Sequence, residues 1–150
     1  MNHLAHRFSR LSAALLLGAA VLAPALAASP ANAPARSDKV LPSGVRVHWL
    51  TVGSGARPVA ADTVTVHYRG TLTDGKEFDS SYRRGTPASF PLNRVVPCWT
   101  QALWEMNVGD TAELTCPAST AYGERGIPGV IPPNSTLKFQ VELLAVPGRE

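Results

Sequence analysis

Six aromatic side chains are the clearest candidates for a functional site in this 150-residue chain. They fall in different predicted elements (strands, a short helix and a long loop), so folding can bring them to one place. Aromatic walls with a few hydrogen-bond donors make an apolar pocket that binds a ligand without needing a nucleophile. Any one buried aromatic is more often plain core, so only the set carries weight. The six are Tyr68, Phe78, Phe90, Trp99, Tyr122 and Phe139.

Other site chemistries lack the residues they need. His48 and His67 lie in predicted strands without metal-ligand spacing, and the two cysteines stand 18 positions apart, so the sequence predicts no metal site. Serine-nucleophile motifs are absent, and no helix is expected after Gly53-Ser54-Gly55, which favours a turn over a nucleotide loop. We therefore expect no cofactor.

Three strings of residues between Val64 and Leu144 occur in a fixed order. They read Val66-His67-Tyr68 followed by Phe78-Asp79-Ser80-Ser81, then Val95-Val96-Pro97-Cys98-Trp99, then Ala121-Tyr122-Gly123 with Ile131-Pro132-Pro133 and Phe139. Together they resemble the FKBP-type peptidyl-prolyl cis-trans isomerases, a family that binds tacrolimus and rapamycin.

The resemblance implies that Trp99 forms the floor of a pocket, under the ring of a substrate proline. It also implies walls around that floor. They are Tyr68, Phe78, Phe90 and Phe139, with Val95 and Val96 beside them.

The same resemblance implies the polar groups of the pocket. Tyr122 would donate its hydroxyl to a substrate carbonyl, and the backbone amides of Val96 and Ile131 would be further donors. Asp79 would hold Tyr68 or polarise the pocket edge, and its part in the isomerisation stays open.

Some positions depart from the family pattern. The segment Leu92–Trp99 resembles secreted bacterial relatives in being two residues shorter than in small cytosolic members, and Cys98 stands where glycine is usual. Ala88 replaces a second pocket aromatic, and Ile127 stands at a loop tip that is histidine in some members. The last two leave substrate preference and drug affinity open.

Hydrophobic periodicity predicts the elements that position these residues. An apolar stripe from Trp99 to Met106 predicts a short helix that begins at Pro97 and ends by Gly109. Alternation along residues 63–71 points Tyr68 inward and His67 towards solvent. The fold class is therefore α+β, an antiparallel sheet wrapped around one short helix. The expected strands span residues 45–52, 63–71, 76–80, 111–116 and 136–144.

Residues 1–27 have the make-up of a secretory signal peptide. Arg7 and Arg10 precede an apolar run from Leu11 to Leu22, and Ala25-Leu26-Ala27 supplies small residues for cleavage. An uncleaved anchor is the alternative, but a single span needs about 20 apolar residues in a row. We expect no membrane association after cleavage, and a periplasmic or secreted location.

The remainder divides into a flexible leader, residues 28–42, and one isomerase domain, residues 43–147. Without the two signal arginines, 12 basic residues face 11 acidic ones, so the formal net charge falls from +3 to +1. That balance argues against a nucleic-acid partner, which needs a basic stripe on the folded domain. No long helical arm precedes residue 40, so we expect a monomer.

Cys98 and Cys116 are predicted to form a disulfide between the helix entrance and the end of a strand. An exported chain with two cysteines, both inside the domain, favours a bridge. The alternative is a pair of buried free thiols.

The resemblance implies a peptidyl-prolyl cis-trans isomerase that speeds folding of exported proteins through non-covalent stabilisation of a twisted amide. Its partners would be proline-containing, unfolded or partly folded polypeptides, with rapamycin or tacrolimus as inhibitors. One alternative is a chaperone or protein-binding module with little turnover, and another is a secreted effector that acts on host proteins.

Overall fold

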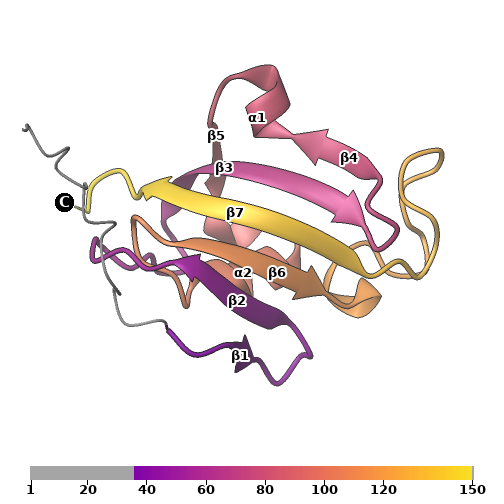
Figure 1. The fold of residues 1–150 in the computed structure, drawn as a ribbon, viewed down its shortest axis with the longest axis horizontal. Coiled ribbons are helices and arrows are strands. Elements are labelled where there is room, and N and C mark those ends of the chain that lie inside the picture. The colour runs from indigo at the N-terminus through magenta and orange to yellow at the C-terminus, as the bar shows by residue number, and fades with distance from the viewer. Residues whose placement is uncertain (1–35, 150) are drawn as a thin grey trace, which may run out of the picture. The chain divides into compact units, whose positions relative to one another are not determined.

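The computed structural model describes residues 36–149 of the chain. The predicted signal peptide, residues 1–27, lies outside the described residues. Within the described part, seven strands form one antiparallel sheet in the order β1-β2-β6-β7-β3-β4, and β5 also pairs with β3 (Figure 1). The strands are β1 (Lys39–Val40), β2 (Arg46–Thr51), β3 (Thr63–Leu72), β4 (Glu77–Ser80), β5 (Ala88–Pro91), β6 (Thr111–Cys116) and β7 (Leu137–Ala145).

The helical segments are short. Helix α2 lies against one face of the sheet, and it buries Trp99 and Leu103 in the core (Figure 1). This arrangement confirms the predicted α+β fold. The segments are α1 (Ser81–Arg84), α2 (Pro97–Leu103) and the 3₁₀ turns η1 (Leu92–Arg94) and η2 (Ala118–Thr120).

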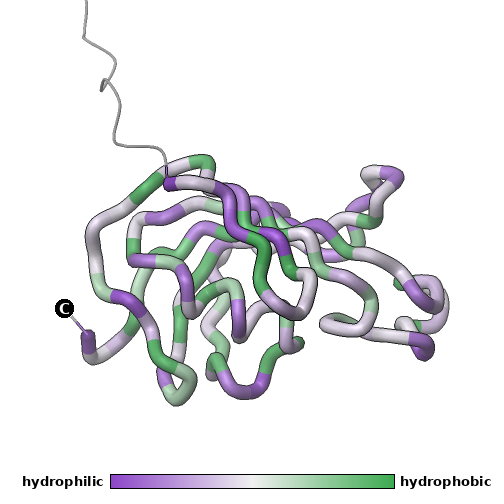
Figure 2. The backbone as a smooth tube through the Cα atoms, turned by 90° about the horizontal axis from the view of Figure 1, so that it is seen from below, coloured by the Kyte–Doolittle hydropathy of each residue, from purple (hydrophilic) through white to green (hydrophobic). Residues whose placement is uncertain are grey.

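The paired strands β3 and β7 run through the sheet and alternate buried with more exposed residues. The backbone coloured by hydropathy shows hydrophobic and hydrophilic stretches following one another (Figure 2). Tyr68 opposes Val141, and Gly70 opposes Phe139 two residues further on. Because side chains two residues apart share a face, Tyr68 and Phe139 both project into the core, as predicted.

Gly70 is required where two aromatic rings meet over β3. A Cβ atom at this position would lie 2.6 Å from the ring of Phe78 and 2.9 Å from the ring of Phe139. Both distances are below any normal contact, so a larger residue would push one ring away. Glycine at position 70 therefore leaves the space that both rings occupy.

The N-terminal boundary of the ordered domain lies before residue 43, which corrects the predicted leader. Lys39 and Val40 pair with β2, and Leu41 is buried. Arg36 forms an ion pair of 2.7 Å with Asp110. Backbone pairing and this long-range ion pair hold the segment, although its composition offers few apolar groups.

Helix α2 ends at Leu103, earlier than the predicted exit near Gly109. After Trp104 the chain turns, and the Asn107 N–H donates to the carboxylate of Asp110 at 2.9 Å instead of continuing the helix. Met106 is still fully buried, so the apolar stripe predicted the packing correctly and the helix end wrongly.

The short elements α1 and β5 are among those that were not predicted. In α1, the Ser80 hydroxyl accepts from the Arg83 N–H at 3.2 Å, and Gly85 ends the turn with φ of 69°. Strand β5 adds to the edge of β3. These caps and edge pairings involve few apolar residues, so periodicity does not reveal them.

His67 is half-buried rather than facing solvent. Its ring stacks on Tyr82 with centroids 4.7 Å apart, and its Nδ1 lies 2.9 Å from the Ser81 hydroxyl. The unpredicted helix α1 covers it, which is why strand alternation alone gave the wrong environment.

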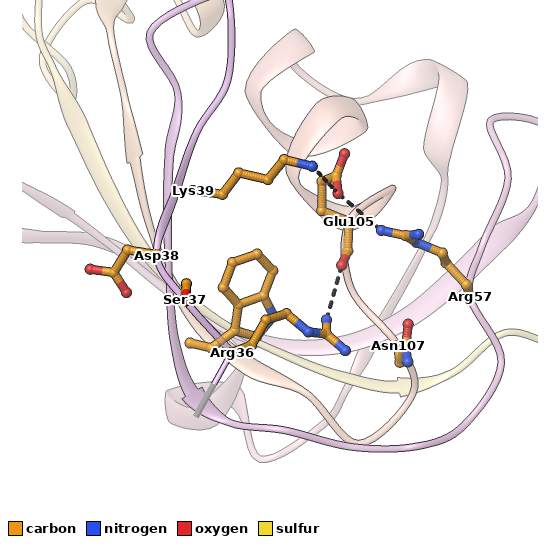
Figure 3. Close-up of a pocket in the computed structure, with 8 residues that line it drawn as sticks. Arg36, Ser37, Asp38, Lys39, Arg57, Glu105 and Asn107 are labelled. Carbon is orange, nitrogen blue, oxygen red and sulfur yellow. Dashed lines mark hydrogen bonds and ion pairs between the residues drawn. The ribbon is translucent and has the colours of Figure 1, made fainter. Parts of the chain in front are cut away.

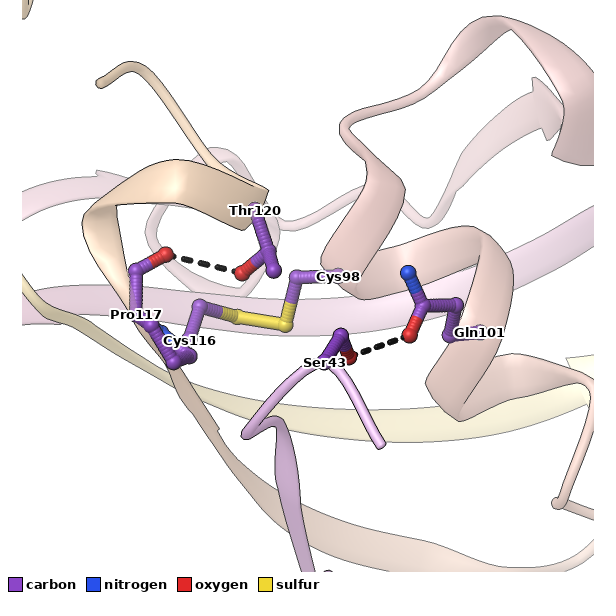
Figure 4. The surroundings of a disulfide bond; sticks show 6 residues. All are labelled: Ser43, Cys98, Gln101, Cys116, Pro117 and Thr120. Carbon is purple, nitrogen blue, oxygen red and sulfur yellow. Dashed lines mark hydrogen bonds between the residues drawn. A yellow bond between two sulfur atoms is a disulfide. The ribbon is translucent and has the colours of Figure 1, made fainter. Parts of the chain in front are cut away.

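Cys98 and Cys116 form the predicted disulfide, with Cα atoms 5.7 Å apart (Figure 4). Both cysteines are fully buried, and the bond ties the start of α2 to the end of β6. Closing a loop of 18 residues stabilises the fold by about 3 kcal/mol on the chain-entropy model.

Within residues 36–149, no helix has the length and apolar character to cross a bilayer.

Candidate active site

A hollow of about 370 Å³ opens beside α2, between strands of the sheet and the long loop after β6. All six aromatic residues singled out in the sequence line it, and so do Asp79, Val95 and Val96. The aromatic rings come from β3, β4, β5, α2, β7 and the loop, so only the folded domain assembles them. We call this hollow the aromatic pocket. Its lining residues are Tyr68, Phe78, Asp79, Phe90, Arg94, Val95, Val96, Trp99, Tyr122 and Phe139.

Trp99 forms the centre of the aromatic pocket. Its indole ring lies 5.1 Å from Tyr68, 5.6 Å from Phe90 and 5.4 Å from Phe139, measured between centroids, and all three rings stand nearly perpendicular to it. Edge-to-face packing of this kind is the favoured geometry for aromatic pairs. Three neighbours therefore fix the orientation of the indole.

The Trp99 indole Nε1 is buried and has no hydrogen-bond partner among the described residues. Leaving a buried donor unpaired costs about 1–3 kcal/mol. Such exceptions are uncommon in folded proteins and require an explanation, of which a functional role is one.

Phe78 and Phe139 form a second wall. Their centroids lie 5.6 Å apart at an interplanar angle of 87°. Phe78 is only partly buried, whereas Phe139 is 5% exposed. Phe78 therefore leaves more of its surface accessible to a ligand than Phe139 does.

A polar network borders the aromatic pocket. The Tyr68 hydroxyl donates to Asp79 Oδ2 at 2.5 Å. Arg84 donates to Asp79 Oδ1 and to the Tyr68 hydroxyl oxygen, the latter at 2.9 Å, and its guanidinium lies 5.6 Å from the Tyr68 ring centroid. Both carboxylate oxygens of Asp79 are thus engaged.

This network fixes the protonation states of its members. Burial raises the pKa of Tyr68, and its hydrogen bond to Asp79 raises it further. Burial alone would raise the pKa of Asp79, but the hydrogen bonds from Tyr68 and Arg84 outweigh it and lower that pKa. At neutral pH the phenol is therefore protonated and the carboxylate ionised.

The mouth of the pocket offers donors that are not in use. The Tyr122 side chain is 39% exposed, and its hydroxyl has no hydrogen-bond partner within residues 36–149. The Val96 N–H, at the N-terminal cap of α2, likewise pairs with no other described residue. Both groups are therefore available for the donor roles that the resemblance implies, and those roles stay predictions.

Ile131 does not agree with that expectation. Its N–H donates to the Ile127 carbonyl at 2.8 Å, and the Ile127 N–H donates back at the same distance. Ile131 is 2% exposed and does not line the aromatic pocket. The predicted role of its amide as a substrate donor is therefore wrong, because a local bridge in the loop already uses that group.

Two arginines near the pocket were missed by the sequence analysis. Arg84 lies five residues after Asp79, at the end of α1, and this helical turn brings its guanidinium back to the Asp79 carboxylate. Periodicity did not reveal α1. Arg94 lines the pocket from η1, directly before Val95. The one sequence signal for Arg94 was its position directly before Val95 and Val96, which were predicted to line the pocket.

The sequence of the chain is similar to those of one protein family. Residues 55–144 match the sequence model of the FKBP-type peptidyl-prolyl cis-trans isomerases. The chain is 50% identical over 116 residues to the FKBP-type peptidyl-prolyl cis-trans isomerase FkpA of Aeromonas hydrophila, covering 77% of this chain and 43% of that protein. It is 45% identical over 112 residues to FK506-binding protein 1 of Saccharomyces cerevisiae, covering 73% of this chain and 98% of the yeast protein.

Solved structures agree. The crystal structure of FkpA from Escherichia coli superposes with a TM-score of 0.70 at 49% identity, covering 73% of this chain and 51% of that one. The chain thus spans about half the length of such bacterial relatives and nearly all of the yeast protein.

Proposed function

Because this chain belongs to the FKBP-type peptidyl-prolyl cis-trans isomerase family, we propose that it catalyses cis-trans isomerisation of X-Pro bonds and that the aromatic pocket is its active site. The observation that carries this proposal is the convergence of six aromatic side chains on one hollow around Trp99. Beside the hollow lie two donors, the Tyr122 hydroxyl and the Val96 N–H, that pair with no group of the described part of the chain.

The reaction breaks no covalent bond, so a nucleophile is not needed. Rotation about the amide C–N bond has a barrier of about 18–20 kcal/mol. The planar amide is more dipolar than the twisted one, so apolar walls destabilise the ground state relative to the transition state. In this mechanism Trp99 supports the prolyl ring, and Phe78 and Phe139 exclude water.

The donors at the mouth would hold the substrate backbone. In this proposal the Tyr122 hydroxyl and the Val96 N–H would donate to carbonyl groups of the substrate backbone. Asp79 acts through Tyr68, because one carboxylate oxygen accepts from the Tyr68 hydroxyl and Arg84 binds the other. Because Arg84 compensates its negative charge, the ionised carboxylate is poorly suited to polarising the amide, so we assign Asp79 a positioning role.

We further propose that the substrates are unfolded or partly folded exported polypeptides in the periplasm or outside the cell. The basis is the signal-like sequence of residues 1–27. Uncatalysed X-Pro steps take about 10–100 s at 25 °C, long enough to delay folding. The name of the yeast relative, FK506-binding protein 1, supports tacrolimus as an inhibitor, and we extend this to rapamycin.

A protease-coupled assay on an X-Pro peptide tests the activity directly. Purified protein should accelerate the slow phase in proportion to its concentration, and rapamycin should abolish the acceleration. A protein that prevents aggregation of an unfolded client yet leaves the slow phase unchanged would reject the proposal in favour of a binding module on the same fold.

A further inference from the structure

Arg94 is the one cationic residue that lines the aromatic pocket, and no carboxylate among residues 36–149 neutralises it. The other charge on the lining, Asp79, is already paired with Arg84. The Arg94 side chain is exposed, and it forms no ion pair or hydrogen bond to the described residues. The pocket therefore has one uncompensated positive charge at its rim.

The backbone that carries Arg94 is fixed. Leu92 is fully buried, its N–H donates to the Asp62 carbonyl at 2.8 Å, and its carbonyl accepts from the Thr100 hydroxyl at 2.7 Å. The turn η1 is thus held to the loop before β3 and to α2. Only the side chain of Arg94 needs to move to meet a ligand.

Arg94 also stands beside the groups that would grip the substrate. Val95 and Val96 follow it directly and line the pocket, and the Val96 N–H is free to bind a substrate carbonyl. A peptide held by that amide would place the side chains next to its proline within reach of the long arginine side chain.

We propose that Arg94 determines specificity by favouring substrates with an acidic residue adjacent to the proline. The proposal rests on the function proposed above. A guanidinium binds a carboxylate through two parallel hydrogen bonds, and it repels a lysine in the same place. Because the site is exposed, the gain for Glu over Gln should be about two- to fivefold, and salt should weaken it.

The test uses peptides in which Glu, Gln or Lys either precedes or follows the proline, with both termini blocked to remove other charges. Isomerisation is measured by NMR exchange, which avoids the charge preference of a coupling protease. In wild type, kcat/KM should fall in the order Glu, Gln, Lys in at least one of the two series. In Arg94→Gln the order should vanish, and in Arg94→Glu it should reverse.

Arg46 offers a matched control. It is an exposed arginine of β2 outside the aromatic pocket, and it forms no ion pair within the described residues, so Arg46→Gln removes the same charge elsewhere. This variant should keep the wild-type order. Equal rates for Glu and Lys peptides in wild type, or an unchanged order in Arg94→Gln, would overturn the proposal. No turnover of the Gln peptides by wild type would instead defeat the proposed function itself.

Discussion

Two of the hollows in the described part of the chain differ in character, and the larger of these two is not the candidate active site. The second hollow has a volume of about 500 Å³, compared with about 370 Å³ for the aromatic pocket. It is lined by residues of the N-terminal segment, β2 and the turn after α2 (Figure 3). We call it the charged hollow. Its lining residues are Arg36, Ser37, Asp38, Lys39, Trp49, Arg57, Glu105 and Asn107.

The cations of the charged hollow are already paired. Lys39 and Arg57 both bind Glu105, at 2.7 Å and 2.9 Å, and Arg36 binds Asp110 at 2.7 Å. The aromatic pocket instead has polar groups that find no partner among residues 36–149, at Trp99, Tyr122, Val96 and Arg94. Unpaired groups, rather than volume, therefore distinguish the proposed binding site from a hollow whose charges hold the fold together.

Asp110 binds three of the residues that line the charged hollow, namely Arg36, Trp49 and Asn107. Its buried carboxylate accepts from the Gly53 N–H at 2.6 Å, from the Trp49 indole at 3.0 Å and from the Asn107 N–H at 2.9 Å, besides binding Arg36. One side chain thus joins the N-terminal segment, β2 and the turn after α2.

The largest expected effect follows from removing that side chain. Asp110→Ala should lower the free energy of unfolding by about 3–5 kcal/mol, because it leaves buried donors without acceptors. Urea unfolding followed by tryptophan fluorescence measures it. Glu105→Gln, which disrupts two exposed ion pairs in the same hollow, should cost less than about 1 kcal/mol. Equal losses in the two variants would contradict the structural role of Asp110.

In the aromatic pocket the effects should fall on activity instead. Phe78→Ala removes a half-buried wall and admits water, so kcat/KM for an X-Pro peptide should drop by about 100-fold, within the cost of deleting a large side chain. Most of the loss should appear in kcat. Thermal unfolding serves as the control, since a matching collapse in stability would identify Phe78 as a core residue.

Asp79→Leu should lower kcat/KM by about tenfold while the domain stays folded, because Tyr68 loses the acceptor that orients it. The lowered pKa of Asp79 adds a pH test. The ionised carboxylate contributes to the free energy of unfolding above the unfolded pKa of about 4, and this contribution is lost as pH falls through the lower folded pKa. Above about pH 5 the carboxylate is ionised, so its interaction with Tyr68 does not change with pH. Wild-type kcat/KM should thus stay flat from about pH 5 to 8. A folded Asp79→Leu variant with full activity would remove this residue from the site.

Tyr122→Phe should have the smallest effect, a loss of about two- to tenfold in kcat/KM, because it removes only one hydroxyl donor worth about 0.5–1.5 kcal/mol. Stability should not change, since that hydroxyl has no partner within the described residues. Unaltered kinetics would mean that the hydroxyl does not reach the substrate.

The contrast between the hollows also explains what the sequence could predict. Alternation along β3 and β7 placed Tyr68 and Phe139 correctly, because strand periodicity decides which residues face the core. The aromatic pocket was therefore predictable almost residue by residue. The charged hollow was not, because the pairing of Arg36 with Asp110 joins positions 74 residues apart and leaves no local pattern.

The errors in the predicted site residues have the same origin. The Ile131 amide was expected to serve the substrate, but a bridge to Ile127 uses it. Arg84 was missed because its link to Asp79 depends on α1, a four-residue helix set by capping rather than by periodicity. Hydrogen-bond partners in loops and caps depend on three-dimensional proximity that composition does not encode.

Tryptophan indoles give the most direct test of which hollow is the site. The protein has three, and each reports on a different place: Trp99 on the aromatic pocket, Trp49 on the charged hollow and Trp104, which is 52% exposed, on the open surface. Titration with an X-Pro peptide or rapamycin should shift the Trp99 indole N–H signal in a ¹H–¹⁵N spectrum and leave those of Trp49 and Trp104 in place. A shift of Trp49 with Trp99 unmoved would contradict the assignment of the active site.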